Sequence, residues 1–470
     1  MTLSKDQIVP ALVQLLGENS VVSEAGDMAG YVSEPRHRFH KQAQAVALPR
    51  TVAEVQAVME WASEVGVHIV PQAGNTGLVG GQVPLFGDEV ILSISKLKGV
   101  RNVDAAAGHM TLDAGTTLQE AHEIAEEAGM LFPLYIASQG SARIGGVLGS
   151  NAGGVQVLSY GNARELCLGV EAVMADGSIY KGLNALRKDN TGYDLKDLLV
   201  GSEGTLGIIT AATLKLFPKP DAHETALVNV ASPEAALELF TMMRARAGNT
   251  LTAFELMPRI GIDFQLKHKM MAQDPTAEMS DWYVLVEISV PRGGVAGGLS
   301  QAVEEAFESG LVGNGVIAET LSQREAFWAA REQMSEVQSR EGASIKHDVS
   351  VPVAAVPELI ARGSEAAQKA VPGIRPVPFG HLGDGNIHFN FSQPEGADGK
   401  AFMDGAEAVH DAVYGVVLEL GGSVSAEHGI GQLKTELLRQ VKDPVALKMM
   451  KAIKSALDPK GILNPGKMLG

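Results

Sequence analysis

Alternating strands and helices, followed by a strand-rich second half, predict a multidomain protein of mixed α and β structure. An apolar strand at 45–48, a helix at 51–66 and a strand at 67–70 make one strand–helix–strand unit, which is typical of α/β architecture. Beyond two prolines near residue 220, apolar strands at 226–230 and 282–290 accompany a further helix. That half predicts an α+β domain with an antiparallel sheet.

Capping residues predict where several helices begin and end. Ser4 and Gln7 form a capping box ahead of an amphipathic helix that Gly17 would end, and a proline at position 10 predicts a kink in it. Thr51 and Thr117 are each followed three residues later by a glutamate, which predicts the starts of two more helices.

Length and charge narrow the class of protein. At 470 residues the chain predicts two to four domains. Its 55 acidic and 38 basic residues give a net charge of −17, which argues against a nucleic-acid groove or an anionic membrane surface as the main target. The single cysteine, Cys167, excludes an internal disulfide or a cysteine-bound metal cluster and reads as a small core residue.

No segment of the sequence predicts a membrane span or a secretory signal. The uncharged stretch 144–163 holds six glycines and several polar residues. Residues 1–10 lack the basic start and apolar run of a signal peptide. We therefore expect a cytoplasmic enzyme.

Three glycine-rich segments in the first half predict loops where the backbone approaches something closely. The segment 71–81 follows a predicted strand, so its N–H groups can turn inward around a phosphate. Segments 140–154 and 201–207 add two more such loops, which together suit one long ligand such as a dinucleotide. The alternative is a set of tight corners in a sheet, because neither G-x-G-x-x-G nor a P-loop motif is present in these segments.

A predicted hairpin brings two histidines together. Asp384-Gly385 is a two-residue turn signal, and folding there places His381 opposite His388 with β-carbons roughly 5 Å apart. Asn390 lies on the same face. Two facing imidazoles are the start of a site for zinc or a similar cation, whereas the alternative is a histidine pair stacked on a sheet surface.

Further along the chain, Glu427 and His428 offer a third ligand and a base. In an extended chain these neighbours point in opposite directions, so one could bind metal while the other faces a substrate. Histidine has a pKa suited to taking a proton near neutral pH.

A third group of residues is cationic. Arg331 and Ser335 share one face of a helix predicted from Ala326 to about Arg340, and Lys346 lies near the start of a strand-like run at 345–353. In an acidic protein such cations would bind an anionic substrate near a metal. The alternative is that each is a solvated surface charge.

Taken together in this order, the glycine loops, the histidine hairpin and the Glu-His pair resemble flavin-dependent dehydrogenases of the vanillyl-alcohol-oxidase type, in the branch that oxidises D-2-hydroxy acids. The resemblance runs from about Ala45 to the Leu463–Lys467 ending. It implies an α+β fold with a two-subdomain FAD-binding domain, an α+β substrate domain and a C-terminal segment that returns to the FAD. The expected limits are 1–44 for an N-terminal helical segment, 45–220, 221–425 and 426–470.

The resemblance also assigns the cofactor and metal residues. Non-covalent FAD is expected, because no histidine or cysteine stands between Pro71 and Gly81. The implied metal, most simply zinc, takes His381, His388 and Glu427. The residues expected to bind FAD are Gly74, Asn75, Thr76, Gly77, Leu78, Gly140, Ser141, Gly145, Gly146, Asn151, Ala152, Gly153, Glu203, Gly204, Ile209 and Asn464.

The segment Lys346–Pro352 looks like D-2-hydroxyglutarate dehydrogenases, in which the lysine meets the distal carboxylate of the substrate. The implied reaction is oxidation of D-2-hydroxyglutarate to 2-oxoglutarate, in which His428 takes the hydroxyl proton and hydride passes from C2 to flavin N5. Arg331, Ser335, Lys346 and Asn390 would bind the substrate, with serine where relatives have threonine.

Several alternatives stay open from the sequence. D-lactate, D-malate or glycolate could be the substrate, and a metal-dependent hydrolase or a flavoprotein without turnover are more distant options. The electron acceptor could be an electron-transfer flavoprotein, a quinone or a cytochrome, and a homodimer is one of the open oligomeric states.

Overall fold

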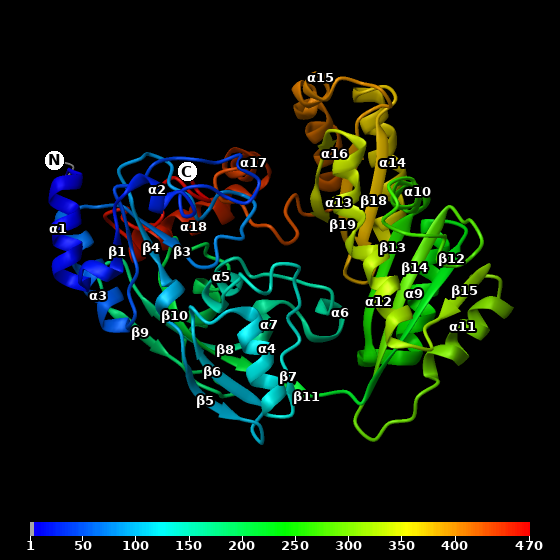
Figure 1. Cartoon of the computed structure of the whole chain (residues 1–470), viewed down its shortest axis with the longest axis horizontal. Helices are drawn as coiled ribbons and strands as arrows, with labels where there is room; N and C mark the ends of the chain where they lie inside the picture. Colours follow the sequence, from blue (N-terminus) through cyan, green and yellow to red (C-terminus); the bar gives the residue numbers. More distant parts are fainter. Residues whose placement is uncertain (1–3) are drawn as a thin grey trace. The chain divides into compact units, whose positions relative to one another are not determined.

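The structure is a computed structural model that describes residues 4–470, so the first three residues of the predicted segment 1–44 lie outside it. The chain divides into two compact units, which Figure 1 shows in sequence colours. Unit 1 holds the residues up to 154, 161–219 and 427–470. Unit 2 holds 155–160 and 220–426, and the short segment 155–160 is a feature that the predicted domain limits did not include.

Among the described residues, unit 1 contains two larger sheets and a two-stranded antiparallel pairing of β7 with β11. The first is four-stranded, in the order β1-β2-β4-β3, with parallel pairing of β4 to both β2 and β3. The second is five-stranded and antiparallel, in the order β5-β6-β10-β8-β9. The elements of unit 1 are α1 (Lys5–Leu16), β1 (Val21–Val22), α2 (Ala25–Met28), β2 (Ala45–Ala47), α3 (Val52–Val65), β3 (Ile69–Gln72), β4 (Val90–Ser93), β5 (Val100–Asp104), β6 (His109–Asp113), α4 (Leu118–Glu127), β7 (Met130–Leu131), α5 (Ile144–Gly149), α7 (Ala163–Leu166), β8 (Cys167–Val173), β9 (Ile179–Gly182), α8 (Leu195–Leu199), β10 (Ile208–Lys215), β11 (Phe217–Pro218), α17 (Thr435–Val441) and α18 (Pro444–Leu457).

The end of the chain joins the first sheet of unit 1. Leu463 forms a parallel bridge to Ile69 at the open edge of β3, through Ile69 N–H to Ile462 O (2.9 Å) and Asn464 N–H to Ile69 O (2.8 Å). Strand pairing at a sheet edge satisfies backbone groups that would otherwise be unpaired. The residues at 462–464 are therefore held directly beside the strand that leads into the first glycine-rich loop.

The predicted caps of unit 1 are present. The Thr51 hydroxyl accepts a hydrogen bond from the N–H of Glu54, and Gly66 ends α3 in the left-handed conformation (φ 76°). Thr117 makes the predicted capping box at α4. Helix α1 also has its capping box at Ser4, and it continues through the proline at position 10, where a kink was predicted.

Unit 2 is built on one large sheet in the order β15-β12-β14-β13-β18-β19-β16, with β17 also pairing with β19. All its strand pairs are antiparallel, which confirms the antiparallel sheet predicted for this half. Its elements are α6 (Val157–Tyr160), β12 (Ala222–Val230), α9 (Pro233–Ala247), β13 (Leu251–Pro258), α10 (Arg259–Lys267), β14 (Trp282–Val290), α11 (Gly298–Glu308), β15 (Asn314–Ile317), α12 (Leu321–Glu332), α13 (Met334–Val337), β16 (Ser344–Ile345), β17 (Asp348–Ser350), α14 (Val356–Ala370), β18 (Arg375–His381), β19 (Asn386–Ser392), α15 (Gly399–Asp404) and α16 (Ala406–Glu419).

Helices cover both faces of the unit 2 sheet. Along β12, Ala226 and Val228 pack into one hydrophobic cluster with residues of α9, α11, α14 and α16. Leu227, between them, points to the opposite face and packs with residues of α10, α12 and α13. This period of two is the pattern expected of a strand that is buried on both sides. We call the face covered by α10, α12 and α13 the polar face, because the charged residues described below lie on it.

Two predicted elements of unit 2 differ from the structure. The single helix predicted from Ala326 to Arg340 is wrong: α12 ends at Glu332, α13 follows after Gln333, and a 3-10 turn covers 338–341. The strand predicted at 345–353 is split into β16 and β17, and between them Nδ1 of the His347 ring lies 2.9 Å from Phe389 O.

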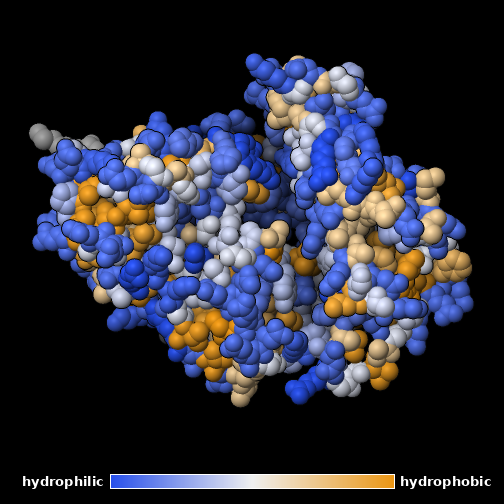
Figure 2. All heavy atoms as spheres, in the orientation of Figure 1, coloured by the Kyte–Doolittle hydropathy of each residue, from blue (hydrophilic) through white to orange (hydrophobic). Residues whose placement is uncertain are grey.

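Within residues 4–470, the structure has no helix that is both long enough and apolar enough to cross a membrane. Hydrophilic side chains dominate the face drawn in Figure 2, with apolar groups in scattered patches.

A buried carboxylate in unit 1 predicts a pH-dependent stability. Glu89 is fully buried and accepts N–H groups of Leu85 (2.7 Å), Phe86 (2.9 Å) and Gly87 (2.6 Å). Burial alone would raise the pKa of Glu89, but these donors outweigh it and lower the pKa below the usual value. The stabilisation is therefore complete above the unfolded-state pKa of about 4.3 and is lost as the pH falls through the lower folded-state pKa.

We expect Glu89→Gln to cost about 1–3 kcal/mol at pH 7, because the hydrogen bonds to a charged acceptor become bonds to a neutral one. The measurement is the chemical denaturation midpoint at pH 7 and below pH 4. The difference between the variant and the parent should shrink at the lower pH. An equal difference at both values would contradict the assignment of the stabilisation to the ionised carboxylate.

Candidate active site

The hairpin of β18 and β19 carries the two predicted histidines, in a register different from the predicted one. His381 lies opposite Asn386, and His388 lies opposite Phe379. The turn is longer than two residues because residues 382–384 form a 3-10 turn, and the N–H of Gly385 donates to His381 O (3.1 Å). The predicted direct pairing of His381 with His388 is therefore wrong.

The shift of two residues keeps both histidines on one face, since side chains alternate with a period of two. Their ring centroids lie 5.6 Å apart, and the rings are nearly perpendicular. His381 is buried and His388 is half-buried. Asn390, two residues beyond His388, is buried on the same face and donates to the side chain of Gln338 (Nδ2 to Oε1, 2.8 Å).

The neighbouring strand adds Asp348 to this face. Asp348 pairs directly with His388 across β17 and β19. Its carboxylate accepts a hydrogen bond from Asn386 (Nδ2 to Oδ1, 3.1 Å). Asp348 lies within the segment 346–352 but had no predicted role. The pattern that could have found it is its spacing of two residues from Lys346, which in a regular strand would place both on one face.

Glu427 and His428 follow directly after Ala426, which is the last residue of unit 2. The N–H of Ala426 donates to Asp348 O (3.2 Å). The chain bends at 426–428. As a result the two side chains do not point apart, as an extended chain would require, and the prediction of opposite directions is wrong. Ligand atoms of Asp348, Glu427 and His428 lie within 4.8 Å of one another.

Two imidazoles and one carboxylate converge in the same region. Ligand atoms of His381, His388 and Glu427 also lie within 4.8 Å of one another. Two histidines and a glutamate form a donor set that zinc and similar divalent cations use when one coordination position stays open for water or substrate. The residues present therefore fit a divalent metal.

Glu255, on β13, is a residue that the sequence analysis missed. It lies opposite His381 in the sheet, is 1% exposed, and accepts from Nδ1 of His381 (2.6 Å) and from Nε of Arg331 (2.6 Å). Burial alone would raise the pKa of Glu255, but His381 and Arg331 outweigh it and lower the pKa to about 2. Nothing in the local sequence marks Glu255, since it stands in an apolar strand more than 120 residues before His381.

The cationic residues lie on elements that border the polar face. Arg331 comes from α12, is 6% exposed, and its guanidinium carbon lies 5.0 Å from the centre of the Phe379 ring. The alternative that Arg331 is a solvated surface charge is therefore wrong. Lys346 is half-buried, and its Nζ donates to both the carbonyl and the hydroxyl of Ser335 (2.9 Å each).

In unit 1, the first glycine-rich loop presents a run of backbone donors. Within the described residues, the N–H groups from Gly74 to Leu78 have no hydrogen-bond acceptor. Asn75 sits in the left-handed region (φ 53°), and its Nδ2 donates to Gly30 O and Ser33 O (2.9 Å each). Consecutive unpaired N–H groups around a left-handed residue form a concave site for an anion such as a pyrophosphate.

The glycine at the start of this loop allows a close approach to the second segment. A Cβ added to Gly74 would lie 2.1 Å from Ser141 O, and one added to Gly146 would lie 2.9 Å from the Cβ of Ala73. The N–H groups of Gly145 and Gly146 are used inside the protein, by Ala114 O and Arg143 O. These glycines let two loops pack closely together. This agrees with the alternative stated above, in which such glycines form tight corners.

The second and third glycine-rich segments bond to each other. The N–H of Gly201 donates to Leu148 O (2.9 Å), and that of Glu203 donates to Gly149 O (2.8 Å). Asn151 and Glu203 both adopt positive φ (51° each). Among the other predicted FAD residues, Ile209 is buried in β10, Gly140, Ala152 and Gly153 lie in loops, and Gly204 adopts φ 70° beside Pro71.

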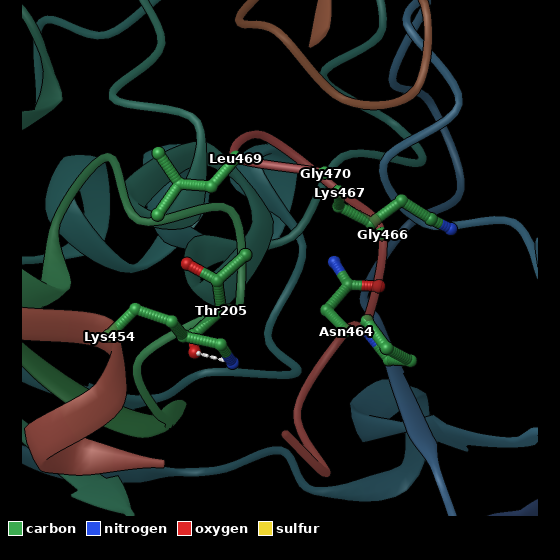
Figure 3. Close-up of a pocket in the computed structure, with 8 residues that line it drawn as sticks. Thr205, Lys454, Asn464, Gly466, Lys467, Leu469 and Gly470 are labelled. Carbon is green, nitrogen blue, oxygen red and sulfur yellow. Dashed lines mark hydrogen bonds between the residues drawn. The ribbon is translucent and has the colours of Figure 1, made fainter. Parts of the chain in front are cut away.

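The C-terminal segment meets these loops through Glu203 and Asn464. Asn464 donates to Gly81 O (2.9 Å) and Glu203 O (2.8 Å), so it joins the first and third segments. Glu203 accepts the N–H groups of Ile430 and Gly431, and burial raises its pKa. Burial also lowers the pKa of Lys467 to about 8, although the charges of Glu89 and Glu203 oppose this. Figure 3 shows Asn464 and Lys467 lining a small pocket with Thr205 and Lys454.

Comparisons with known proteins agree with this organisation. Residues 43–182 match the family described as FAD binding domain, and residues 219–468 match FAD linked oxidases, C-terminal domain. The chain therefore belongs to the family of FAD-linked oxidases. This membership removes the hydrolase alternative, in which the glycine loops would be only structural.

Individual relatives indicate a narrower class of enzyme than the family matches do. The chain is 36% identical to D-2-hydroxyglutarate dehydrogenase of Xanthomonas citri pv. viticola over 99% of this chain and 96% of that protein. It is 39% identical to the mitochondrial D-2-hydroxyglutarate dehydrogenase of Bos taurus, over 90% of this chain and 76% of that protein. The resemblance found in the sequence is confirmed. Because several relatives are named as mitochondrial, the cytoplasmic location stays a prediction.

Solved structures support the fold. P-cresol methylhydroxylase with bound substrate superposes with a TM-score of 0.75 at 18% identity, covering 99% of this chain and 96% of that one. The 4-ethylphenol oxidase from Gulosibacter chungangensis gives a TM-score of 0.73 at 17% identity, covering 99% and 98%. The predicted α+β fold of the vanillyl-alcohol-oxidase type is thus confirmed.

The contact between Gly74 and Ser141 gives a test of the first loop. We expect Gly74→Ala to weaken FAD retention at least about tenfold, or about 1.4 kcal/mol, because the added Cβ would push apart two loops that must stay in contact. The measurement is the ratio of flavin to protein absorbance after dialysis. Gly415→Ala is the matched control, since a Cβ there meets open space in helix α16. Full retention in Gly74→Ala would contradict this role.

Proposed function

We propose that this protein oxidises D-2-hydroxyglutarate to 2-oxoglutarate with FAD and a divalent metal, most simply zinc. The observation that carries the proposal is that a metal-binding donor set and two cations, Arg331 and Lys346, border the same face of one sheet. The similarity to relatives named D-2-hydroxyglutarate dehydrogenase supports the choice of substrate. The dicarboxylate needs both features, since one end reacts and the other end carries a second negative charge.

When bound, the metal would supply a Lewis acid for the reacting hydroxyl, and FAD would supply the acceptor for the hydride equivalent from C2. His381, His388 and Glu427 would hold the metal. His428 takes the hydroxyl proton on its imidazole, as a neutral histidine can near pH 7. Glu427 is thus proposed as a metal ligand and His428 as the base, and the bend at 426–428 brings both side chains to the same region.

The substrate is held from two sides. Asn390 lies on the face of the histidines and orients the C1 end. Arg331 and Lys346 bind the C5 carboxylate, and the hydroxyl of Ser335 positions Lys346 through its hydrogen bond. Within the described residues only Nε of Arg331 donates to a protein group, so its remaining N–H groups can form the bidentate contact that carboxylates favour.

The proposed FAD residues are those of the first loop, from Gly74 to Leu78, together with Asn464 and the second and third segments. The unpaired N–H groups of the first loop support a pyrophosphate there. No histidine or cysteine stands in the loop, which supports non-covalent binding.

An anaerobic visible spectrum of the purified, FAD-loaded protein tests the proposal. Rapid bleaching of the flavin band by D-2-hydroxyglutarate, and slow bleaching by D-lactate, is the expected result. Fast bleaching by D-lactate alone would support the oxidation of a 2-hydroxy acid, but it would contradict the proposal that Arg331 and Lys346 bind a C5 carboxylate. A protein that cannot be loaded with FAD would overturn the proposal as a whole.

Replacing Lys346, which is proposed to bind the C5 carboxylate, should lower activity on dicarboxylates more than activity on monocarboxylates. We expect Lys346→Ala to lower kcat/KM for D-2-hydroxyglutarate about a hundredfold or more, because breaking one side of a buried charge pair costs about 3–5 kcal/mol. Turnover of D-lactate should change little. Steady-state kinetics with both substrates is the measurement.

Lys369→Ala is the matched control for this variant, since Lys369 is an exposed lysine paired with Glu365 on the surface of α14. It should change neither substrate. If Lys346→Ala lowered kcat/KM for both substrates by the same factor, this would contradict the proposal that Lys346 binds the C5 carboxylate.

Loss of a metal ligand should remove metal and activity while leaving the flavin in place. We expect His388→Asn to bind less zinc and to lose about a hundredfold or more in kcat, since metal catalysis supplies several kcal/mol. Metal content by elemental analysis and flavin content by absorbance are measured on the same sample. His68→Asn, on the surface of unit 1 beside Asp88, is the control. Unchanged turnover of the parent protein after metal removal would contradict the role of the metal.

A further inference from the structure

Glu255 contacts both halves of the proposed site. We propose that Glu255 is a positioning residue that couples metal binding by His381 to recognition of the distal carboxylate by Arg331. The inference rests on the proposed function and extends it, because it predicts that a single buried carboxylate sets both metal affinity and the preference for dicarboxylates.

The geometry divides the two oxygens of Glu255 between its partners. Oε1 accepts from Nδ1 of His381 and Oε2 accepts from Nε of Arg331, both at 2.6 Å. The strand pairing of Glu255 with His381 fixes the first contact, since the two residues lie directly opposite each other. All three side chains are less than 10% exposed. A short, charge-assisted hydrogen bond in a buried position is stronger and more directional than one at the surface.

The contact with His381 decides which ring nitrogen can bind a metal. An ionised carboxylate only accepts hydrogen bonds, so Nδ1 of His381 must carry the proton. Nε2 is then the nitrogen with the lone pair, as a metal ligand requires. A carboxylate behind a ligating histidine also holds the ring in place and makes it a better donor.

The contact with Arg331 is part of a wider attachment of α12 to the sheet. Arg324, Trp328 and Arg331 recur at intervals of four and three residues, so they lie on one helix face. Arg324 and Trp328 both donate to a second buried carboxylate, Glu287 on β14 (2.8–2.9 Å). Glu287 anchors the same helix without touching His381 in any contact described, and it therefore provides a matched control.

A neutral amide cannot replace Glu255. Glutamine has one acceptor oxygen and one donor NH2, so it can satisfy His381 or Arg331 but not both. If the oxygen faces His381, a donor faces the donor of Arg331. If the oxygen faces Arg331, the NH2 forces the His381 proton onto Nε2 and removes the lone pair that would bind the metal.

The test compares Glu255→Gln and Glu287→Gln in the FAD-loaded protein. The zinc Kd is measured by competition with a chelator, and KM is measured at saturating zinc for D-2-hydroxyglutarate and D-lactate. For Glu255→Gln we expect a zinc Kd about 10–100-fold higher, as for other partners of ligating histidines. The KM for D-2-hydroxyglutarate should rise more than the KM for D-lactate.

Glu287→Gln should lower Tm, because it removes the negative charge and one of the two oxygens that accept from Arg324, but it should leave the zinc Kd unchanged. If Glu255→Gln does not accumulate as folded protein, Glu255→Asp serves instead: it keeps the charge but is one methylene too short to reach both partners. Unchanged zinc Kd and KM in the Glu255 variant, or equal effects in the Glu287 variant, would overturn the inference. If the parent protein itself neither binds zinc nor oxidises D-2-hydroxyglutarate, the proposed function fails first.

Discussion

The pairing of buried charges on one face of the unit 2 sheet is the constraint on which the site depends. Glu255 lies 1% exposed between two groups that can be cationic, and without them its ionised form would be costly in that position. Because the charge needs both partners, the strand of Glu255, the hairpin of His381 and the helix of Arg331 have to keep a fixed arrangement. The same requirement that stabilises the buried carboxylate therefore also positions the residues proposed to bind metal and substrate.

Local patterns in the sequence predicted several helix starts and the face shared by the two histidines. They could not predict contacts between residues far apart in the chain. Caps at Thr51 and Thr117 depend on residues three apart, and the structure has them. The hairpin register was wrong because Asp384-Gly385 signals a two-residue turn, whereas a 3-10 turn absorbs two further residues. The histidines still share a face, since a shift by an even number of residues preserves it. Glu255 was out of reach because its two partners lie 76 and 126 residues away.

The glycine-rich segments show why composition alone leaves a function open. All three looked alike in sequence, but their backbone N–H groups differ in the structure. Those of Gly145, Gly146 and Gly201 are used within the protein, whereas those from Gly74 to Leu78 have no acceptor among the described residues. The sequence predicted close approach at every segment. Only the hydrogen bonding in the structure separates the loops that bond to the rest of the protein from the loop proposed to bind FAD.

Fold and substrate are set by different parts of the chain. Structures named for p-cresol and 4-ethylphenol share this fold at 17–18% identity, so the backbone does not determine the substrate. In unit 2, Asp348 lies directly opposite His388 across β17 and β19, and Asn390 lies at an alternate position of β19. Alternate positions face the same way, so a few side-chain identities can define a binding surface without moving a strand. The proposed preference for a dicarboxylate then depends on which residue types occupy that face, where the buried Glu255 contacts His381 and Arg331.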